Sequence, residues 1–548
     1  MRSIHFHDRS PLMAAMVSCC LFAFRAQAQD RPSESDMFGP PAQAPPSSGA
    51  AEAGAPVAAG AATTPAANPA APITPQPSAA PDSRDEAILG QTESKMFNDE
   101  LGPADPLTIG GQLYLRAQST TLQGQNLKDA RTDMPTLLDV FFDARPNDRV
   151  RGFVLGRMTY DPLLPSSTGA LGNLGPQSAI GGTAGSASLS SLLSGQTNAP
   201  HVLLDQLWLR FDIAHAVFIT AGRQHVRWGT ARFWTPADFL HLRHRNPLDV
   251  FDARTGTTMV KVHVPVESKA WNFYAYGITE GENGLPTLSS LAGAARGEFV
   301  LDSTELGLGV YGKPNTRAKF AGDLSSGIGD VDLYGEIAVL DARQSDRVRY
   351  DPNATLPSAG TPPSYESPSD AQRDLIEQAV DAIYPSYRQR GYRPQAVVGA
   401  NYSRKYNDND VWTIGAEYFY NGLGYSDDQV YPGLVFPHAN TLVNPASFFY
   451  LGKHYAALYF TMPAPYKLDL HTFTLSTLGN LSDRSFITRL DYSYTLLTHL
   501  TFEAFGAVHY GRPSGEFRFR LQTPESLGIS VTQPPSLFDV GIGLRMAI

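Results

Sequence analysis

The stretch that decides the fold is Phe538-Asp-Val-Gly-Ile-Gly-Leu-Arg-Met-Ala-Ile548, at the end of the 548-residue chain. Apolar residues occupy every second position, and Asp, Gly, Arg and Ala stand between them. Because successive side chains of a strand point to opposite faces, this stretch predicts a strand with one fully apolar face. Such a face promotes aggregation at an exposed edge in water, but meets lipid in a membrane barrel. We therefore expect Phe538 and Ile548 to lie in the strand that closes a barrel.

The same alternation recurs from about residue 106 onward, most clearly at 107–118, 260–264, 331–339 and 500–510. Short polar turns alternate with long connections; the long ones lie near 120–135, 162–200, 227–256, 279–296, 342–393, 421–451 and 511–534. Outer-membrane barrels place short turns in the periplasm and long loops outside. This pattern predicts an all-β, transmembrane, antiparallel up-and-down barrel of about 18 strands. Sixteen is the alternative, since 296–325 is hard to divide into strands.

One long connection also contains a helical pattern. Ser367 can cap a helix and Pro368 fits its first turn. Apolar residues then recur at helical spacing, at Leu375, Ile376, Ala379, Val380, Ile383 and Tyr384. We expect a helix that packs over the barrel rim.

Composition argues against other classes of protein. Charged residues make up 18% and aromatic residues 10%, and beyond the N-terminus no run of 18 apolar residues could form a membrane helix. A net charge of −10 argues against a nucleic-acid binder. The sequence has no G-x-S-x-G, H-E-x-x-H or P-loop motif. We therefore predict no enzyme activity, no cofactor and no metal site.

The N-terminal region predicts export. Basic residues, an apolar stretch at 11–24 and Ala26-Gln-Ala28 resemble a signal peptide over residues 1–28. Residues 29–105 are predicted to be a disordered, Ala/Pro-rich periplasmic linker, because 40–82 is almost only Ala, Pro, Gly, Ser and Thr. The barrel is predicted to occupy 106–548. Cys19 and Cys20 lie in the signal, so the mature chain has no disulfide.

Two similar short segments flank the low-complexity part of the linker, at 33–39 and 92–98. Each contains a Met-Phe pair, Met37-Phe38 and Met96-Phe97. One hypothesis is that these pairs dock a periplasmic protein or plug the barrel; the alternative is chance similarity or a duplicated linker end.

Residues 223–254 concentrate cationic and aromatic side chains in an acidic chain. Six arginines fall here, at Arg223, Arg227, Arg232, Arg243, Arg245 and Arg254, with Trp228, Trp234 and Asp238 among them. Arginine forks bind carboxylates or phosphates, so one hypothesis is an inward loop that forms an anion-preferring pore constriction. The alternative is structural: Arg and Asp pair within the lumen and pin the loop, while Trp228 and Trp234 pack beneath it.

A family resemblance rests on the same segment. Gly222-Arg-Gln224, Trp228-Gly229 and Trp234-Thr-Pro-Ala-Asp238 resemble the GRQ…WG…NPTD segment of a broad group of bacterial outer-membrane porin-like proteins, with Thr235 and Ala237 as departures. The stretches 320–325 and 332–336 also resemble that group, so the likeness covers about 200–340. It implies an outer-membrane barrel and carries over no substrate.

Together these patterns predict a porin-like channel of the bacterial outer membrane for small solutes, with a preference for anions or acidic sugars. The alternative is a non-conducting barrel scaffold in a secretion, polysaccharide-export or motility complex, which the long linker favours. The expected partners are outer-membrane lipid and lipopolysaccharide, the barrel-assembly machinery, and a periplasmic protein bound through residues 29–105.

Overall fold

The structure is a computed structural model that describes residues 106–163, 200–279, 291–355, 370–522 and 532–547. Within these ranges it leaves out 148, 242–243, 249–253, 345, 408–409, 436–437, 439–442, 444–446 and 467. The chain divides into two units, Met1–Thr74 and Pro75–Ile548, and every described residue belongs to the second. The predicted signal peptide, linker and both Met-Phe pairs therefore lie outside the described residues.

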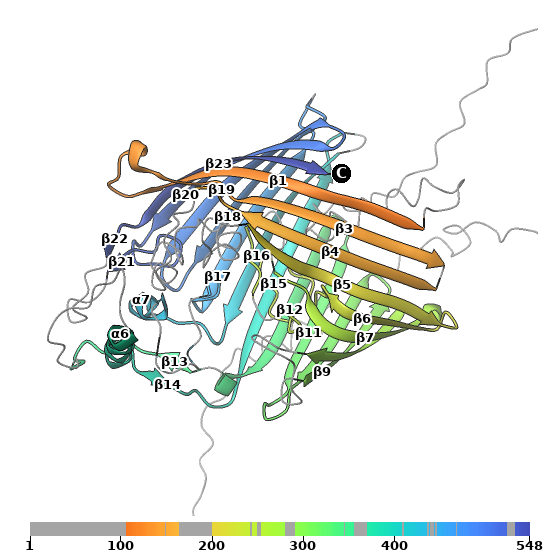
Figure 1. Cartoon of the computed structure of the whole chain (residues 1–548), viewed down its shortest axis with the longest axis horizontal. Coiled ribbons are helices and arrows are strands. Elements are labelled where there is room, and N and C mark those ends of the chain that lie inside the picture. Colours follow the sequence, from red (N-terminus) through yellow and green to blue (C-terminus); the bar gives the residue numbers. More distant parts are fainter. Residues whose placement is uncertain are drawn as a thin grey trace, which may run out of the picture. The chain divides into compact units, whose positions relative to one another are not determined.

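Eighteen strands form one closed antiparallel barrel, as the alternating pattern predicts (Figure 1). Each strand pairs with the next along the chain. The barrel strands are β1 (Leu107–Leu122), β3 (Thr136–Asn147), β4 (Val150–Tyr160), β5 (His201–Ile213), β6 (Val217–Gln224), β7 (Thr257–Val266), β8 (Trp271–Thr279), β9 (Leu291–Leu301), β10 (Thr304–Gly312), β11 (Lys319–Ile328), β12 (Val331–Asp341), β15 (Tyr392–Lys405), β16 (Val411–Asn421), β17 (His454–Pro463), β18 (His471–Asn480), β19 (Ser485–Leu497), β20 (Leu500–Gly511) and β23 (Ser536–Ala547).

The remaining elements lie in the connections. They are the strands β2 (Arg131–Asp133), β13 (Arg347–Val348), β14 (Ser386–Tyr387), β21 (Leu521–Gln522) and β22 (Thr532–Gln533), the helices α6 (Asp370–Ile383) and α7 (Tyr431–Val435), and the 3-10 turns η1 (Leu127–Asp129), η2 (Glu267–Lys269), η4 (Ala342–Gln344) and η5 (Asp428–Val430). In the described part of the chain, no helix has the length and hydropathy to cross a membrane.

The C-terminal strand closes the barrel. β23 pairs with β1 from Gln112↔Ala547 to Leu122↔Ser536, and with β20 on its other edge; Figure 1 shows β23 beside β1. The predicted alternation is present: Val540 and Ile542 are 47% and 56% exposed, whereas Asp539 is 1% exposed. Phe538 pairs with Thr121, and Ile548 lies outside the described residues.

The structure also decides the number of strands. The stretch 296–325, which is hard to divide by its sequence, contains the end of β9, all of β10 and most of β11. The two-residue turn between β9 and β10, Asp302–Ser303, has Asp302 at a φ of 54°. The alternative of 16 strands is therefore wrong, because a turn of only two residues separates β9 from β10.

Short and long connections gather at opposite ends of the barrel, as predicted. We call these the short-turn end and the long-loop end. Two connections at the long-loop end are themselves short, at 313–318 and 481–484.

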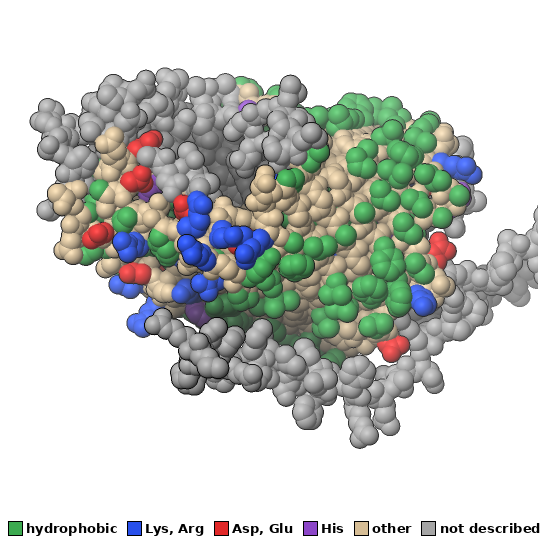
Figure 2. Space-filling view, turned by 90° about the horizontal axis from the view of Figure 1, so that it is seen from below, with side chains coloured by type: hydrophobic (Ala, Val, Ile, Leu, Met, Phe, Trp, Pro, Cys, Tyr) green, Lys and Arg blue, Asp and Glu red, His purple; other side chains and the backbone are tan. Residues whose placement is uncertain are grey.

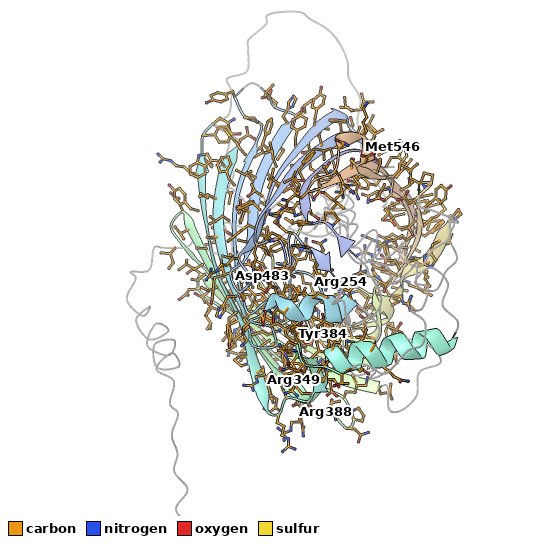
Figure 3. All side chains as sticks on the ribbon, turned by 90° about the vertical axis from the view of Figure 1, so that its left-hand side faces the viewer. Arg254, Arg349, Tyr384, Arg388, Asp483 and Met546 are labelled. Carbon is orange, nitrogen blue, oxygen red and sulfur yellow. The ribbon has the colours of Figure 1, made fainter. Side chains whose placement is uncertain are left out.

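The predicted helix forms as α6. Its residues Ala379, Val380 and Ile383 are buried, as is Tyr384 directly after it. They pack with α7 and with Leu451 and Phe519 from other connections. Ser367 and Pro368 lie outside the described residues. Figure 3, which looks at the long-loop end, shows α6 and α7 side by side across one side of the strand ring.

Candidate functional site

The connection between β6 and β7 folds into the barrel. We call residues 225–256 the inward loop; its described part is 225–241, 244–248 and 254–256. Its apolar side chains join two buried clusters with inward-facing wall residues of strands from β7 to β20. The loop members of these clusters are Trp228, Ala231, Phe233, Trp234, Ala237, Phe239, Leu240 and Leu248. The loop is therefore part of the protein's main core.

Glu417 on β16 holds the tip of the inward loop. Its carboxylate accepts hydrogen bonds from the backbone N–H groups of Arg232 (2.9 Å), Phe233 (3.2 Å) and Trp234 (2.9 Å). The hydroxyl of Tyr334 on β12 donates a fourth, at 3.0 Å. Consecutive backbone N–H groups that converge in this way form a concave anion site. Here the anion is a side chain of the barrel wall that is 3% exposed.

Glu336 on β12 makes a second attachment. Its carboxylate accepts from the backbone N–H groups of Ala231 (2.6 Å) and Ala237 (3.3 Å). Gly229 lies directly against this carboxylate with a φ of +102°, and a Cβ there would come within 2.3 Å of Glu336 Oε1. Only glycine tolerates both the left-handed backbone and this close approach. The Trp-Gly pair of the resemblance segment thus has a physical reason in this chain.

The two tryptophans anchor the loop on opposite sides of the lumen. Trp234 is fully buried, stacks on Phe419 with ring centroids 5.6 Å apart, and donates its indole N–H to Phe449 O at 2.9 Å. Trp228 packs edge-on against Tyr276 of β8, at 5.6 Å. Both indole rings therefore pack between the loop and the barrel wall.

Asp238 ties the two arms of the inward loop together. It accepts from Arg254 Nη1 at 2.9 Å and contacts His241 Nδ1 at 2.9 Å, and all three side chains are less than 10% exposed. Burial alone would raise the pKa of Asp238, but the charges of His241 and Arg254 outweigh it and hold that pKa well below its usual range. Arg254 is therefore committed to a carboxylate.

The structure separates the six arginines of the pore hypothesis. Arg223 lies opposite Leu207 in the β5–β6 register, and Leu207 is 48% exposed on the outward face. Because directly paired residues share a face of the sheet, Arg223 points outward and does not line the lumen. Arg227 donates to the carbonyl of Ala231. Arg245 is buried, at 8% exposure; Arg243 lies outside the described residues.

Arg232 differs from the others. Its guanidinium lies over the ring of Tyr459 on β17, 4.0 Å from the centroid. The side chain is partly exposed. Within the described part of the chain, no carboxylate pairs with this guanidinium. Among the described arginines of the loop, Arg232 thus combines partial exposure with a guanidinium that no described carboxylate pairs.

The sequence analysis did not identify the wall residues that fix the loop. Glu336 and Glu417 follow the inward alternation of their strands, but so do many charged residues. Several of those form ion pairs with other strands. Arg157 pairs with Asp139 and Asp205 on the two neighbouring strands, and Arg296 of β9 reaches across β10 to Asp323 of β11 at 2.7 Å. An indication in the sequence was that Glu336 ends the stretch 332–336, which resembles the porin-like group.

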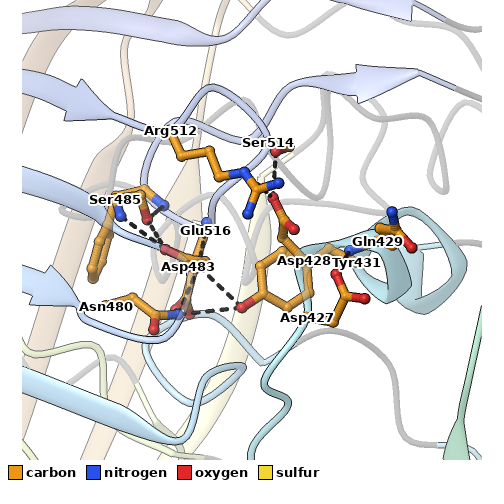
Figure 4. Close-up of polar contacts among 11 residues, drawn as sticks. Asp427, Asp428, Gln429, Tyr431, Asn480, Asp483, Ser485, Arg512, Ser514 and Glu516 are labelled. Carbon is orange, nitrogen blue, oxygen red and sulfur yellow. Dashed lines mark hydrogen bonds and ion pairs between the residues drawn. The ribbon is translucent and has the colours of Figure 1, made fainter.

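A second buried polar cluster lies at the long-loop end (Figure 4). Asn480 donates to Asp483 at 2.7 Å and to Glu516 at 2.8 Å, while Tyr431 of α7 donates to Asp483 at 3.0 Å. Burial, together with the negative charge of Asp483, raises the pKa of Glu516 to about 8. The cluster joins the β16–β17 and β20–β23 connections to the wall.

Comparisons with known proteins give the following. No protein-family model matches the sequence, and no curated protein matches it. The fold is similar to Acinetobacter baumannii OccAB1 (10% identity; 82% of this chain and 98% of that chain; TM-score 0.45) and to Pseudomonas aeruginosa OccK8 (OprE) (10%; 80% and 98%; 0.42). It is also similar to a triple mutant of the Rhodopseudomonas blastica porin (11%; 81% and 100%; 0.35).

Proposed function

We propose that this chain is an outer-membrane channel for small solutes, narrowed by the inward loop. The observation that carries the proposal is a closed barrel with an apolar outward face, a charged inward face and a core loop held across its lumen by Glu336 and Glu417. This combination suits a wall between lipid and water. No catalytic step is part of the proposal.

Solvent access inside the barrel supports a conducting lumen. Three inward-facing charged side chains remain open to water although they lie on the inner wall. These are Glu298, Asp491 and Arg545, at 38%, 35% and 27% side-chain exposure. Each pairs with an oppositely charged neighbour, so the wall is hydrated without a large net field of one sign.

We further propose that the channel prefers anions or acidic sugars, and that Arg232 selects them. A guanidinium on an aromatic ring keeps its charge and its fork of donors, while the ring restricts its motion. The paired state of Arg254 and the outward position of Arg223 remove two arginines from this role. Arg232 therefore carries the preference.

The test is ion selectivity in planar bilayers under a KCl gradient. Removing one charge at about 6 Å from a passing ion in water changes the energy of that ion by about 0.7 kcal/mol. The change has opposite signs for chloride and potassium, about 1.4 kcal/mol between them, so Arg232→Ala should lower the chloride-to-potassium permeability ratio about tenfold. Arg223→Ala is the matched control, since it removes an arginine from the outward face. Equal reversal potentials for Arg232→Ala and the unmodified protein would contradict the anion preference.

A non-conducting scaffold is the second candidate. The observation that favours it is the extent of the loop core, in which the inward loop and the β16–β17 connection share one cluster with walls from β12 to β20. A scaffold would insert into bilayers without open-channel events. In that case, retrieval of a specific periplasmic protein by residues 29–105 would support the role in an envelope complex.

A further inference from the structure

Exposed arginines gather on the outer rim of the long-loop end. Arg317 comes from the turn between β10 and β11, Arg343 from η4, and Arg390 from the segment just before β15. We call these three residues the rim cluster. Figure 2 shows Lys and Arg side chains gathered at one edge of the apolar outer surface, on the side of the long-loop end.

Arg317 lies near Tyr392, the first residue of β15, with its Cζ 5.8 Å from the centroid of the tyrosine ring. Arg390 stands two positions before Tyr392 in the chain. The N–H of Ala342 in η4 donates to the carbonyl of Gly391 at 3.0 Å, which holds η4 against the segment that carries Arg390. The two ends of the β12–β15 connection and the β10–β11 turn thus form one surface.

The positive charge of this surface exceeds what its neighbours neutralise. Arg343 pairs with Asp341 at 2.9 Å and uses that carboxylate. Among the residues that the structure describes, no ion pair within 4.0 Å joins Arg317 or Arg390 to a carboxylate, although the charge of Arg317 also acts on Asp341. Figure 3 shows two further arginines at the long-loop end, Arg349 and Arg388, and Arg388 pairs with Asp346 at 2.7 Å. Arg317 and Arg390 thus add positive charge near Arg343, whose guanidinium uses only some of its N–H donors in its pair with Asp341.

The rim cluster borders directly on the apolar belt. Phe320, on the outward face of β11, is 49% exposed, and Tyr392 is 40% exposed. Their ring centroids are 6.4 Å apart. Aromatic side chains at this level mark the boundary between acyl chains and head groups. An amphiphile whose chains lie along β11 would therefore present its head group to Arg317, Arg343 and Arg390.

We propose that the rim cluster binds the phosphate of a lipopolysaccharide lipid anchor in the outer leaflet. The inference rests on the proposed function, because that function makes the long-loop end the outer one. Guanidinium forks bind phosphate through paired, charge-assisted hydrogen bonds, and clusters of them on a membrane border favour anionic lipids. The apolar side of the site supplies the surface for the acyl chains.

The experiment measures lipid retained on the purified full-length chain in detergent, by native mass spectrometry with diphosphoryl lipid A. The triple variant Arg317→Ala, Arg343→Ala, Arg390→Ala should reduce the bound fraction at least about tenfold, because it removes all the charge-assisted contacts. The control triple variant is Arg149→Ala, Arg404→Ala, Lys405→Ala, which removes three exposed cations from the short-turn end. Arg404 is the closest match, since it lies opposite Trp412 in the strand register there.

Retention of lipid A by the control variant and its loss from the rim variant would support the proposal. Equal loss from both variants would overturn it, since charge alone would explain binding. Equal binding of phosphatidylglycerol to the unmodified chain would also overturn it, because the site would then not select the glycolipid. Conductance is independent of these outcomes: a silent channel that still binds lipid A through the rim cluster would refute the channel and keep the lipid site on the outer rim.

Discussion

Glu417 offers the sharpest test of how the inward loop is held. In Glu417→Ala, the backbone N–H groups of Arg232, Phe233 and Trp234 lose their shared acceptor while they remain buried. An unsatisfied buried donor costs about 1–3 kcal/mol, so even the low end totals about 3 kcal/mol for three donors. Since about 1.4 kcal/mol corresponds to a factor of ten, local opening of the loop should become roughly 100-fold more frequent.

Hydrogen exchange followed by mass spectrometry measures this opening in detergent, on peptides that cover residues 228–240. Glu503→Ala is the control, because Glu503 also faces inward but pairs with Arg545 at 3.3 Å and makes no hydrogen bond to the loop. Glu417→Gln keeps the size and one acceptor oxygen, so it should fall between the two. Unchanged exchange at 232–234 in Glu417→Ala, or an equal rise in the control, would refute the attachment.

Three further predictions concern other contacts. Gly229→Ala should accelerate hydrogen exchange of the inward loop roughly 30-fold, because a left-handed φ costs a non-glycine residue about 1–2 kcal/mol and the new methyl group displaces the carboxylate of Glu336. The control is Gly506→Ala, where a Cβ meets nothing within 4 Å, and it should leave this exchange unchanged. Glu516 has a pKa of about 8 in the folded protein and about 4.3 when unfolded, so protection of residues 512–520 from hydrogen exchange should fall as the pH rises between these values. Glu516→Gln should flatten this pH profile. An equal slope in the variant would count against the role of Glu516. Arg157→Met leaves two buried carboxylates without their cation and should lower the free energy of unfolding by about 3–5 kcal/mol in urea titrations, whereas a loss below 1 kcal/mol would show that the pairs contribute little.

The fold could be predicted from the sequence because barrel strands have a period of two that survives without an alignment. In β23 the positions of Val540 and Ile542 face outward, and that of Asp539 faces inward, as the alternation requires. The parity of short and long connections also predicted 18 strands. The turn at Asp302 was the weak point, because it has only two residues between β9 and β10.

The candidate site was predicted only in outline. A cationic, tryptophan-containing loop was visible in the sequence, and its inward path was a hypothesis. Which arginines face the lumen was not visible, since Arg223 and Arg232 are nine positions apart and differ only through strand register and loop path. The attachment points, Glu336 and Glu417, are at least 99 residues from the loop residues that they bind, and they have no local signature.

The sequence by itself determined which face of each strand is apolar, where the chain turns, and that the barrel closes through its last strand. These properties follow from local alternation and turn chemistry. Only the tertiary structure decided that the inward loop belongs to the core, that backbone N–H groups meet buried carboxylates, and that arginines from two connections lie on one rim near Tyr392. Those contacts join residues far apart in the chain, and they depend on where the closed barrel brings its strands.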